Sequence, residues 1–180
     1  MLLGLLSTLL VRQPDILVSE DGDLMAIRDG SGGYLFSSLT RSKFEREIWL
    51  RRAGLENGAA WPAEGYSADG RLACDSQGCI HRIHGLTVAL VLEPAALPED
   101  CRRADIVISV DSIRGECAAP LQMDWRDRRR NGANALWIGE DGAVVNVAVD
   151  DLRGRRPWVA GTGPLPAPDD PPALEIERVQ

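Results

Sequence analysis

The feature that most restricts the fold is a short apolar run at Asp105–Val110, in which most positions are β-branched Ile or Val. A run of this length and composition is typical of a strand that is buried on both faces. We therefore expect it to lie in the middle of a sheet.

Other strand-like segments surround this run. Asp15–Ser19, Leu24–Arg28 and Tyr34–Phe36 alternate or cluster apolar residues, and the glycine-containing turns Glu20–Gly22 and Asp29–Gly33 separate them. This spacing predicts a β-meander. Further strands are predicted at 72–74, 79–83, 86–92, 135–138 and 144–149, the last two as a hairpin around Gly139–Gly142.

Helical periodicity appears in fewer places. Ser42–Gly54 places Phe44, Ile48 and Leu50 on one side, and Gly54 is a suitable C-cap. Shorter helices are predicted at 94–104, with Pro98 in the first turn, and at 124–130; residues 55–71 are predicted to form a loop. The expected fold class is therefore α+β (mixed α/β), with β-meanders, a mixed sheet and two or three helices.

Composition indicates how the chain divides into segments, and the net charge restricts how it could bind nucleic acid. Hydrophobic residues make up 44% and charged residues 26%, which is ordinary for a folded domain. The apolar segment Met1–Val11 is too short to cross a bilayer, and we interpret it as the end of a membrane helix. One domain is predicted at 12–160, followed by a Pro-rich, acidic, disordered tail at 161–180. The net charge of -7 means that any nucleic-acid contact must be local.

The four cysteines, Cys74, Cys79, Cys101 and Cys117, are the most specific chemical feature. Their spacing lacks the close C-x2-C pairs that are typical of zinc sites. We favour sequential disulfides, Cys74 with Cys79 and Cys101 with Cys117, which would close two loops and would require an oxidising compartment. The sequence permits three pairings, and four free thiols in a cytosolic domain is the alternative.

No catalytic or cofactor-binding signature is present. His81 and His84 have no neighbouring metal-ligand motif and are predicted at the surface of a hairpin. Gly30–Gly33 joins two strands instead of opening a helix, so it is predicted to be a turn and not a phosphate-binding loop. We therefore expect no catalytic residue, no metal and no cofactor.

Two arginine clusters with tryptophan are the candidate contacts to single-stranded DNA, because guanidinium groups bind phosphates and indoles stack on bases. The candidates are Trp125, Arg126, Arg128, Arg129, Arg130, Arg153, Arg155, Arg156 and Trp158. The alternative is a solvated helix end and a loop, since Asp124, Asp127, Asp150 and Asp151 lie in the same segments and would repel phosphate.

An ordered series of segments adds a family resemblance: Asp15–Ser19, Ala26–Arg28, Trp49-Leu50, Cys74, Gly78-Cys79, Asp100–Ser109, Cys117 and Arg156–Trp158. Over roughly residues 12–160 the chain resembles the C-terminal region of ComEC-type DNA-internalisation proteins in their alphaproteobacterial form. The resemblance implies a role in natural transformation, in which single-stranded DNA passes the inner membrane. It also implies a membrane-channel partner and a position on the periplasmic face.

In many members of that family this region resembles a metallo-β-lactamase domain with metal-binding histidines. Here Val110–Ile113 follows the buried run, and the histidines are absent, so the resemblance implies a shortened, degenerate domain without catalysis. Two alternatives stay open. One is a metal-dependent nuclease that uses Asp105, Asp111 and Asp124, and the other is a module that binds only the channel protein.

Overall fold

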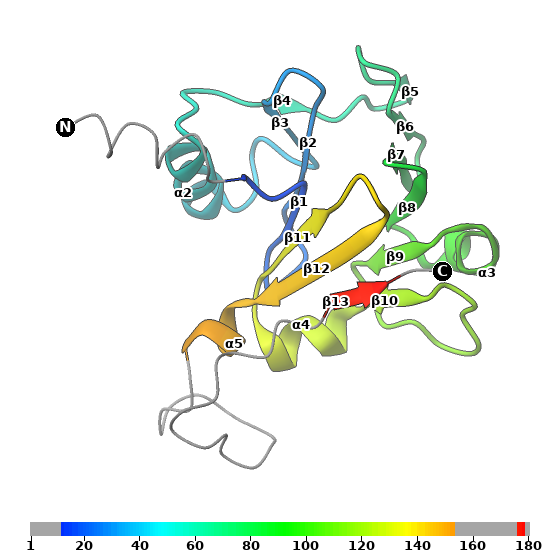
Figure 1. Cartoon of the computed structure of the whole chain (residues 1–180). Helices are drawn as coiled ribbons and strands as arrows, with labels where there is room; N and C mark the ends of the chain where they lie inside the picture. Colours follow the sequence, from blue (N-terminus) through cyan, green and yellow to red (C-terminus); the bar gives the residue numbers. More distant parts are fainter. Residues whose placement is uncertain (1–11, 154–175, 179–180) are drawn as a thin grey trace.

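Two β-sheets that face one another form the centre of the molecule (Figure 1). The computed structural model describes residues 12–153 and 176–178. The first sheet has the strand order β13-β12-β11-β1-β2-β3-β4, and the second has the order β10-β9-β8-β7-β6-β5. The expected α+β class is confirmed.

The strands of the first sheet come from both ends of the described chain. They are β1 (Ile16–Val18), β2 (Met25–Arg28), β3 (Tyr34–Phe36), β4 (Ala59–Ala60), β11 (Asn134–Ile138), β12 (Ala143–Ala148) and β13 (Ile176–Arg178). The β1–β2–β3 meander and the β11–β12 hairpin are both confirmed. Antiparallel pairing of β1 with β11 joins these two units into one sheet.

The middle of the chain forms the second sheet. Its strands are β5 (Gly65–Tyr66), β6 (Leu72–Cys74), β7 (Gly78–Ile83), β8 (Leu86–Val91), β9 (Ile106–Ser109) and β10 (Leu121–Met123). Strand β9 pairs in parallel with β8 on one side and with β10 on the other, and every residue of β9 is buried. The prediction that this run lies inside a sheet is therefore confirmed.

The helices are α2 (Lys43–Ala53), α3 (Leu97–Arg103), α4 (Trp125–Asn131) and α5 (Val149–Arg153), with a short 3-10 turn at Pro94–Ala96. The first three match the predicted helices. Helix α5 was not predicted, and neither were the short strands β4 and β5 within the predicted loop 55–71, nor β10.

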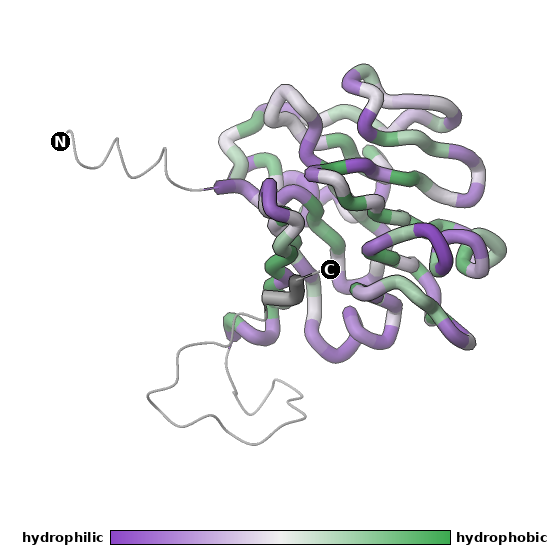
Figure 2. Tube along the Cα trace, turned by 45° about the vertical axis from the view of Figure 1, so that its right-hand side comes forward, coloured by the Kyte–Doolittle hydropathy of each residue, from purple (hydrophilic) through white to green (hydrophobic). Residues whose placement is uncertain are grey.

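One apolar core fills the space between the sheets. Ile16 and Leu136 of the first sheet belong to the same buried cluster as Val88, Leu90 and Ile106 of the second sheet. This clustering follows from strand alternation, because every second side chain of a strand points to the same face. In Figure 2 green, hydrophobic stretches of the trace run through the interior of the fold, and purple, hydrophilic stretches gather mainly at the bends on its outside.

Each sheet also carries a helix on its outer face. Leu97 and Cys101 of α3 pack against Ala89, Val91 and Val107 of the second sheet. On the first sheet, α2 packs through Leu50 and Trp49 against residues that include Tyr34 and Phe36.

The predicted apolar side of α2 needs a correction. Leu50 is buried, but Phe44 is 75% exposed, because it lies at the N-terminal end of α2 whereas the contacts with the sheet come from the second half of the helix. Gly54 ends the helix with φ 69°, so its predicted role as C-cap is confirmed.

Two disulfides close loops in the second sheet. Cys74 bonds to Cys79, its cross-strand partner on β7, and Cys101 of α3 bonds to Cys117. The structure shows the predicted sequential pairing, and all four cysteines are disulfide-bonded. From the loss of loop-closure entropy in the unfolded chain, the disulfide that closes the shorter loop should stabilise the fold by about 2 kcal/mol, and the one that closes the longer loop by about 3 kcal/mol.

The predicted terminal segments lie mostly outside the described residues. This applies to Met1–Val11 and to the proposed tail at 161–180, apart from Ile176–Arg178, which form strand β13 beside β12. Within the described ranges, no helix combines the length and the apolar character needed to cross a membrane.

The prediction that both histidines lie at the surface is wrong for His81. His84 is exposed at the β7–β8 turn, but His81 is only 1% exposed and points from β7 into the core beside Cys79 and Ile83. Neither ring nitrogen forms a hydrogen bond with the described residues. Burial lowers the pKa of His81, so the imidazole is neutral near pH 7 in the folded chain.

His81 should therefore make stability depend on pH. The unfolded chain binds a proton on this imidazole near pH 6.5, and the folded chain does so only at lower pH. The free energy of unfolding should fall as the pH drops below about 6.5, by at most about 1.4 kcal/mol per pH unit. Urea unfolding at about pH 7.5 and about pH 5.5 should show a smaller fall for His81→Leu. An identical pH dependence of the two chains would contradict this assignment.

Candidate functional site

Helix α4 carries most of the candidate DNA-contacting residues, and a capping box fixes its start. Oδ1 of Asp124 accepts hydrogen bonds from the backbone N–H groups of Arg126 at 2.7 Å and Asp127 at 3.2 Å. Oδ2 of Asp127 accepts in return from the N–H of Asp124 at 2.9 Å. The other oxygen of Asp124 accepts from the N–H of Ile113 at 3.0 Å, which fixes the helix against the segment that follows β9.

The arginines of α4 divide between the interior and the solvent. Arg126, Arg129 and Arg130 are exposed, whereas Arg128 is 0% exposed. The helical period explains the division, because Arg128 lies one turn after the buried Asp124. This i, i+4 spacing is the signal in the sequence that could have identified Arg128 as an inward-facing residue.

Arg128 is therefore not a DNA contact, which corrects the prediction from sequence. Its Nη1 donates to the carbonyl oxygen of Ser109 at 2.5 Å, and its Nη2 donates to that of Val110 at 2.9 Å. Burial lowers the pKa of Arg128, and attraction to Asp124 and Asp127 opposes that effect. The side chain joins α4 to the C-terminal end of β9.

Gly22 completes the site of the Arg128 guanidinium from the first sheet. Gly22 lies in the β1–β2 turn with φ 74°, and a Cβ atom there would lie 2.5 Å from Nη2 of Arg128. A larger residue would be strained and would also collide with the guanidinium. The buried arginine thus joins α4 to both sheets.

Trp125, Arg126, Arg129 and Arg130 lie on the outward side of α4, and Arg153 lies at the end of the neighbouring helix α5; we call these five residues the cationic surface. Trp125 is 44% exposed, and the guanidinium of Arg129 lies 5.5 Å from the centroid of its ring. This cation–π contact orients an indole and a cation next to each other.

Helix α5, which contacts α4, ends at Arg153, the first residue of the second predicted arginine cluster. Gly132, which follows α4, lies close to Val149 and Asp150 of α5, and Arg153 ends the same helix. Arg153 is exposed and pairs with Asp150 at 3.6 Å. Arg155, Arg156 and Trp158 lie outside the described residues.

The carboxylates near this surface are largely held by backbone amides. Asp124 and Asp127 form the capping box, and Asp151 accepts a hydrogen bond from the N–H of Ala148 at 3.2 Å. Asp150 faces Arg153. Asp124 is buried and Asp127 is half-buried, so the exposed guanidinium groups are the main charged groups that a ligand would meet on α4, whereas Asp151 of α5 remains exposed.

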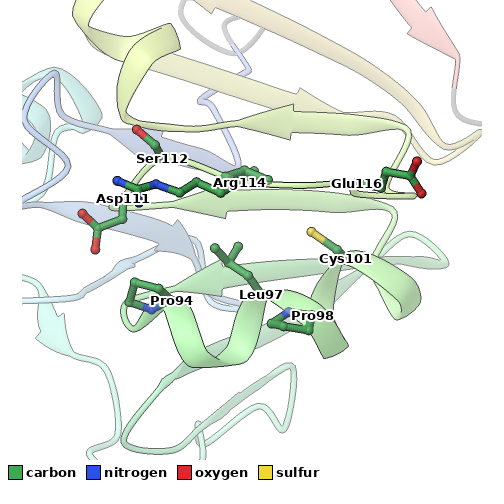
Figure 3. A pocket seen from close by; sticks show the side chains of 9 residues that line it. Pro94, Leu97, Pro98, Cys101, Asp111, Ser112, Arg114 and Glu116 are labelled. Carbon is green, nitrogen blue, oxygen red and sulfur yellow. The ribbon is translucent and has the colours of Figure 1, made fainter.

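A hollow of about 520 Å³ lies on the other side of the segment that follows β9, between this segment and α3 (Figure 3). Pro94 and Leu97 form an apolar wall, and Asp111, Arg114 and Glu116 contribute charged side chains. The hollow holds two carboxylates and one guanidinium, so it does not continue the cationic surface.

The three carboxylates of the nuclease alternative are not gathered at one end of β9, because Asp105 precedes the strand, Asp111 follows it and Asp124 caps α4. Asp124 is occupied by three backbone amides, and Oδ2 of Asp105 accepts from the N–H of Thr87 at 2.8 Å. Asp111 is exposed at the hollow. Residues 12–153 and 176–178 contain no group of three or more His, Cys, Asp or Glu side chains that could hold a metal ion.

No protein-family model, curated protein or solved structure matches this chain, so the family resemblance depends on the sequence segments alone.

The different positions of Arg128 and Arg129 predict different effects of substitution. Arg128→Ala removes both donors from the carbonyl groups of Ser109 and Val110 and leaves a cavity, so the free energy of unfolding should fall by about 3 kcal/mol. Arg129→Ala, at an exposed position, should change it by about 0.5 kcal/mol or less. Urea unfolding measures both values, and equal losses for the two variants would contradict the assignment of Arg128 to the interior.

Proposed function

We propose that this chain is an accessory, non-catalytic domain of a ComEC-type DNA-uptake channel and assists the passage of single-stranded DNA. The cationic surface of α4 and α5 is the observation that carries the proposal. It combines exposed guanidinium groups with an exposed indole, the two groups that bind phosphates and stack on bases without reading sequence.

A periplasmic position of this domain at the inner membrane is part of the same proposal. The Cys74–Cys79 and Cys101–Cys117 disulfides support it, because disulfides persist in oxidising compartments and are rare in the cytosol. The apolar segment Met1–Val11 would connect the domain to the last membrane helix of the channel.

We also propose that the domain is a shortened, degenerate relative of a metallo-β-lactamase domain. Arg128 supports this interpretation, since its guanidinium lies at the C-terminal end of β9, the segment where the family resemblance would place histidines. The nuclease alternative has no comparable support, because Asp105 and Asp124 are bonded to backbone amides.

Binding of labelled oligothymidylate, followed by fluorescence anisotropy at several salt concentrations, tests the proposal. The variant Arg126→Ala/Arg129→Ala/Arg130→Ala should bind at least about tenfold more weakly than the wild-type chain. The slope of log affinity against log salt should become about 2 units shallower, since each phosphate contact to a single strand contributes about 0.7. Trp125→Ala should weaken binding about tenfold, with little change in that slope.

A matched control removes three exposed arginines elsewhere, in Arg71→Ala/Arg82→Ala/Arg102→Ala. This variant changes the net charge equally and should bind nearly as well as the wild-type chain. Equal weakening of the two triple variants would assign binding to general charge and contradict the proposed surface. Absence of binding by the wild-type chain would contradict the DNA role and favour a module that binds only the channel.

A further inference from the structure

The outer face of the first sheet is covered unevenly. Helix α2 packs on the side of β1, β2 and β3, while beside it Ala135 and Trp137 of β11 point outward and are partly exposed. An apolar groove of about 280 Å³ lies there. We call it the β11 groove; its apolar lining includes Pro14, Trp49, Trp137, Val147, Val149 and Leu152.

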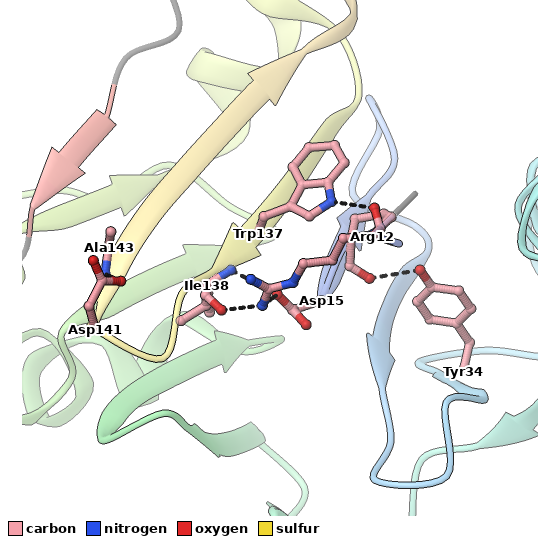
Figure 4. Close-up of polar contacts among 8 residues, drawn as sticks. Arg12, Asp15, Tyr34, Trp137, Ile138, Asp141 and Ala143 are labelled. Carbon is pink, nitrogen blue, oxygen red and sulfur yellow. Dashed lines mark hydrogen bonds and ion pairs between the residues drawn. The ribbon is translucent and has the colours of Figure 1, made fainter. Parts of the chain in front are cut away.

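The start of the described chain forms part of this groove and is firmly held (Figure 4). The guanidinium of Arg12 contacts Oδ2 of Asp15 at 2.9 Å and also donates to the carbonyl oxygen of Ile138. Nε1 of Trp137 donates to the carbonyl oxygen of Arg12 at 3.0 Å, and the Tyr34 hydroxyl donates to that of Pro14 at 2.7 Å. These bonds fix where residue 12 lies relative to the groove.

The residues before Arg12 are almost entirely apolar, with the sequence MLLGLLSTLLV at 1–11. An apolar segment needs an apolar environment, and it joins the folded domain at the wall of the groove. If this segment ends in a bilayer, Arg12 lies at the headgroup level, and the groove, whose wall includes Arg12, lies close to the lipid surface.

We propose that the β11 groove is the membrane-facing surface of the domain and rests on the lipid bilayer. This inference depends on the proposed membrane attachment through residues 1–11 and adds which face of the domain meets the lipid. The side chains suit that position: Trp49 and Trp137 supply indoles that favour the interface, and Leu152 is 69% exposed. Arg12 and Arg52, which also line the groove, can meet anionic headgroups.

Quenching of tryptophan fluorescence by brominated lipid tests the orientation. The full chain is mixed with vesicles of phosphatidylcholine and phosphatidylglycerol whose acyl chains carry bromine. Trp49→Phe and Trp137→Phe should each remove part of the quenched emission, because these indoles lie at the groove. Trp125→Phe should remove none, because Trp125 lies on α4 outside the groove.

A pair of surface variants tests the contribution of the groove to binding. Leu152→Asp places a carboxylate at the groove and should weaken vesicle binding about tenfold in a sedimentation assay. Phe44→Asp, at an equally exposed apolar position outside the groove, should stay within about twofold of the wild-type chain. Both positions are exposed, so both variants should keep the wild-type unfolding temperature.

The outcomes separate the inference from the proposed function. Vesicle binding that is lost on deletion of residues 1–11, without preferential quenching of Trp49 and Trp137, would overturn the orientation and leave membrane attachment intact. Absence of vesicle binding by the full chain would overturn both. Dimers in lipid-free solution that Leu152→Asp dissociates would assign the groove to a second copy of the chain and also overturn the inference.

Discussion

The buried guanidinium of Arg128 is the contact on which the arrangement of the domain depends. It lies against Gly22 in the first sheet, donates to Ser109 and Val110 at the end of β9 in the second sheet, and belongs to α4. A buried cation is costly unless hydrogen bonds and nearby charges compensate for lost hydration. Two backbone carbonyl groups and the surrounding carboxylates supply that compensation, so the interaction positions three elements at once.

The same helix determines the proposed function. Because Asp124 and Arg128 face inward one turn apart, the intervening and following positions place Arg126, Arg129 and Arg130 in solvent. The helix therefore uses one arginine to join the sheets and presents the others, with Trp125, to a ligand. The Cys101–Cys117 disulfide restrains the segment between α3 and β10, against which the Asp124 cap is bonded.

Local sequence patterns predicted much of this fold. Alternation and turn glycines indicated the meander and the β11–β12 hairpin, and Gly54 marked the end of α2. The pairing of β1 with β11 joins segments far apart in the chain, and no local pattern encodes it.

His81 and Arg128 were assigned to the surface because polar residues usually lie there, but strand alternation in β7 and the i, i+4 spacing in α4 bury them. Trp125, Arg126, Arg129, Arg130 and Arg153 kept their predicted exposure.

The division of α4 into an inward cation and an outward cationic surface is the central claim, and NMR of the arginine side chains tests it most directly. Spectra of the Nε–Hε groups would be recorded before and after addition of oligothymidylate. The account predicts that the Arg128 proton exchanges slowly with water and keeps its chemical shift, while the signals of Arg126, Arg129 and Arg130 move. Fast exchange at Arg128, or a DNA-induced shift at Arg128 as large as those of its neighbours, would contradict the account.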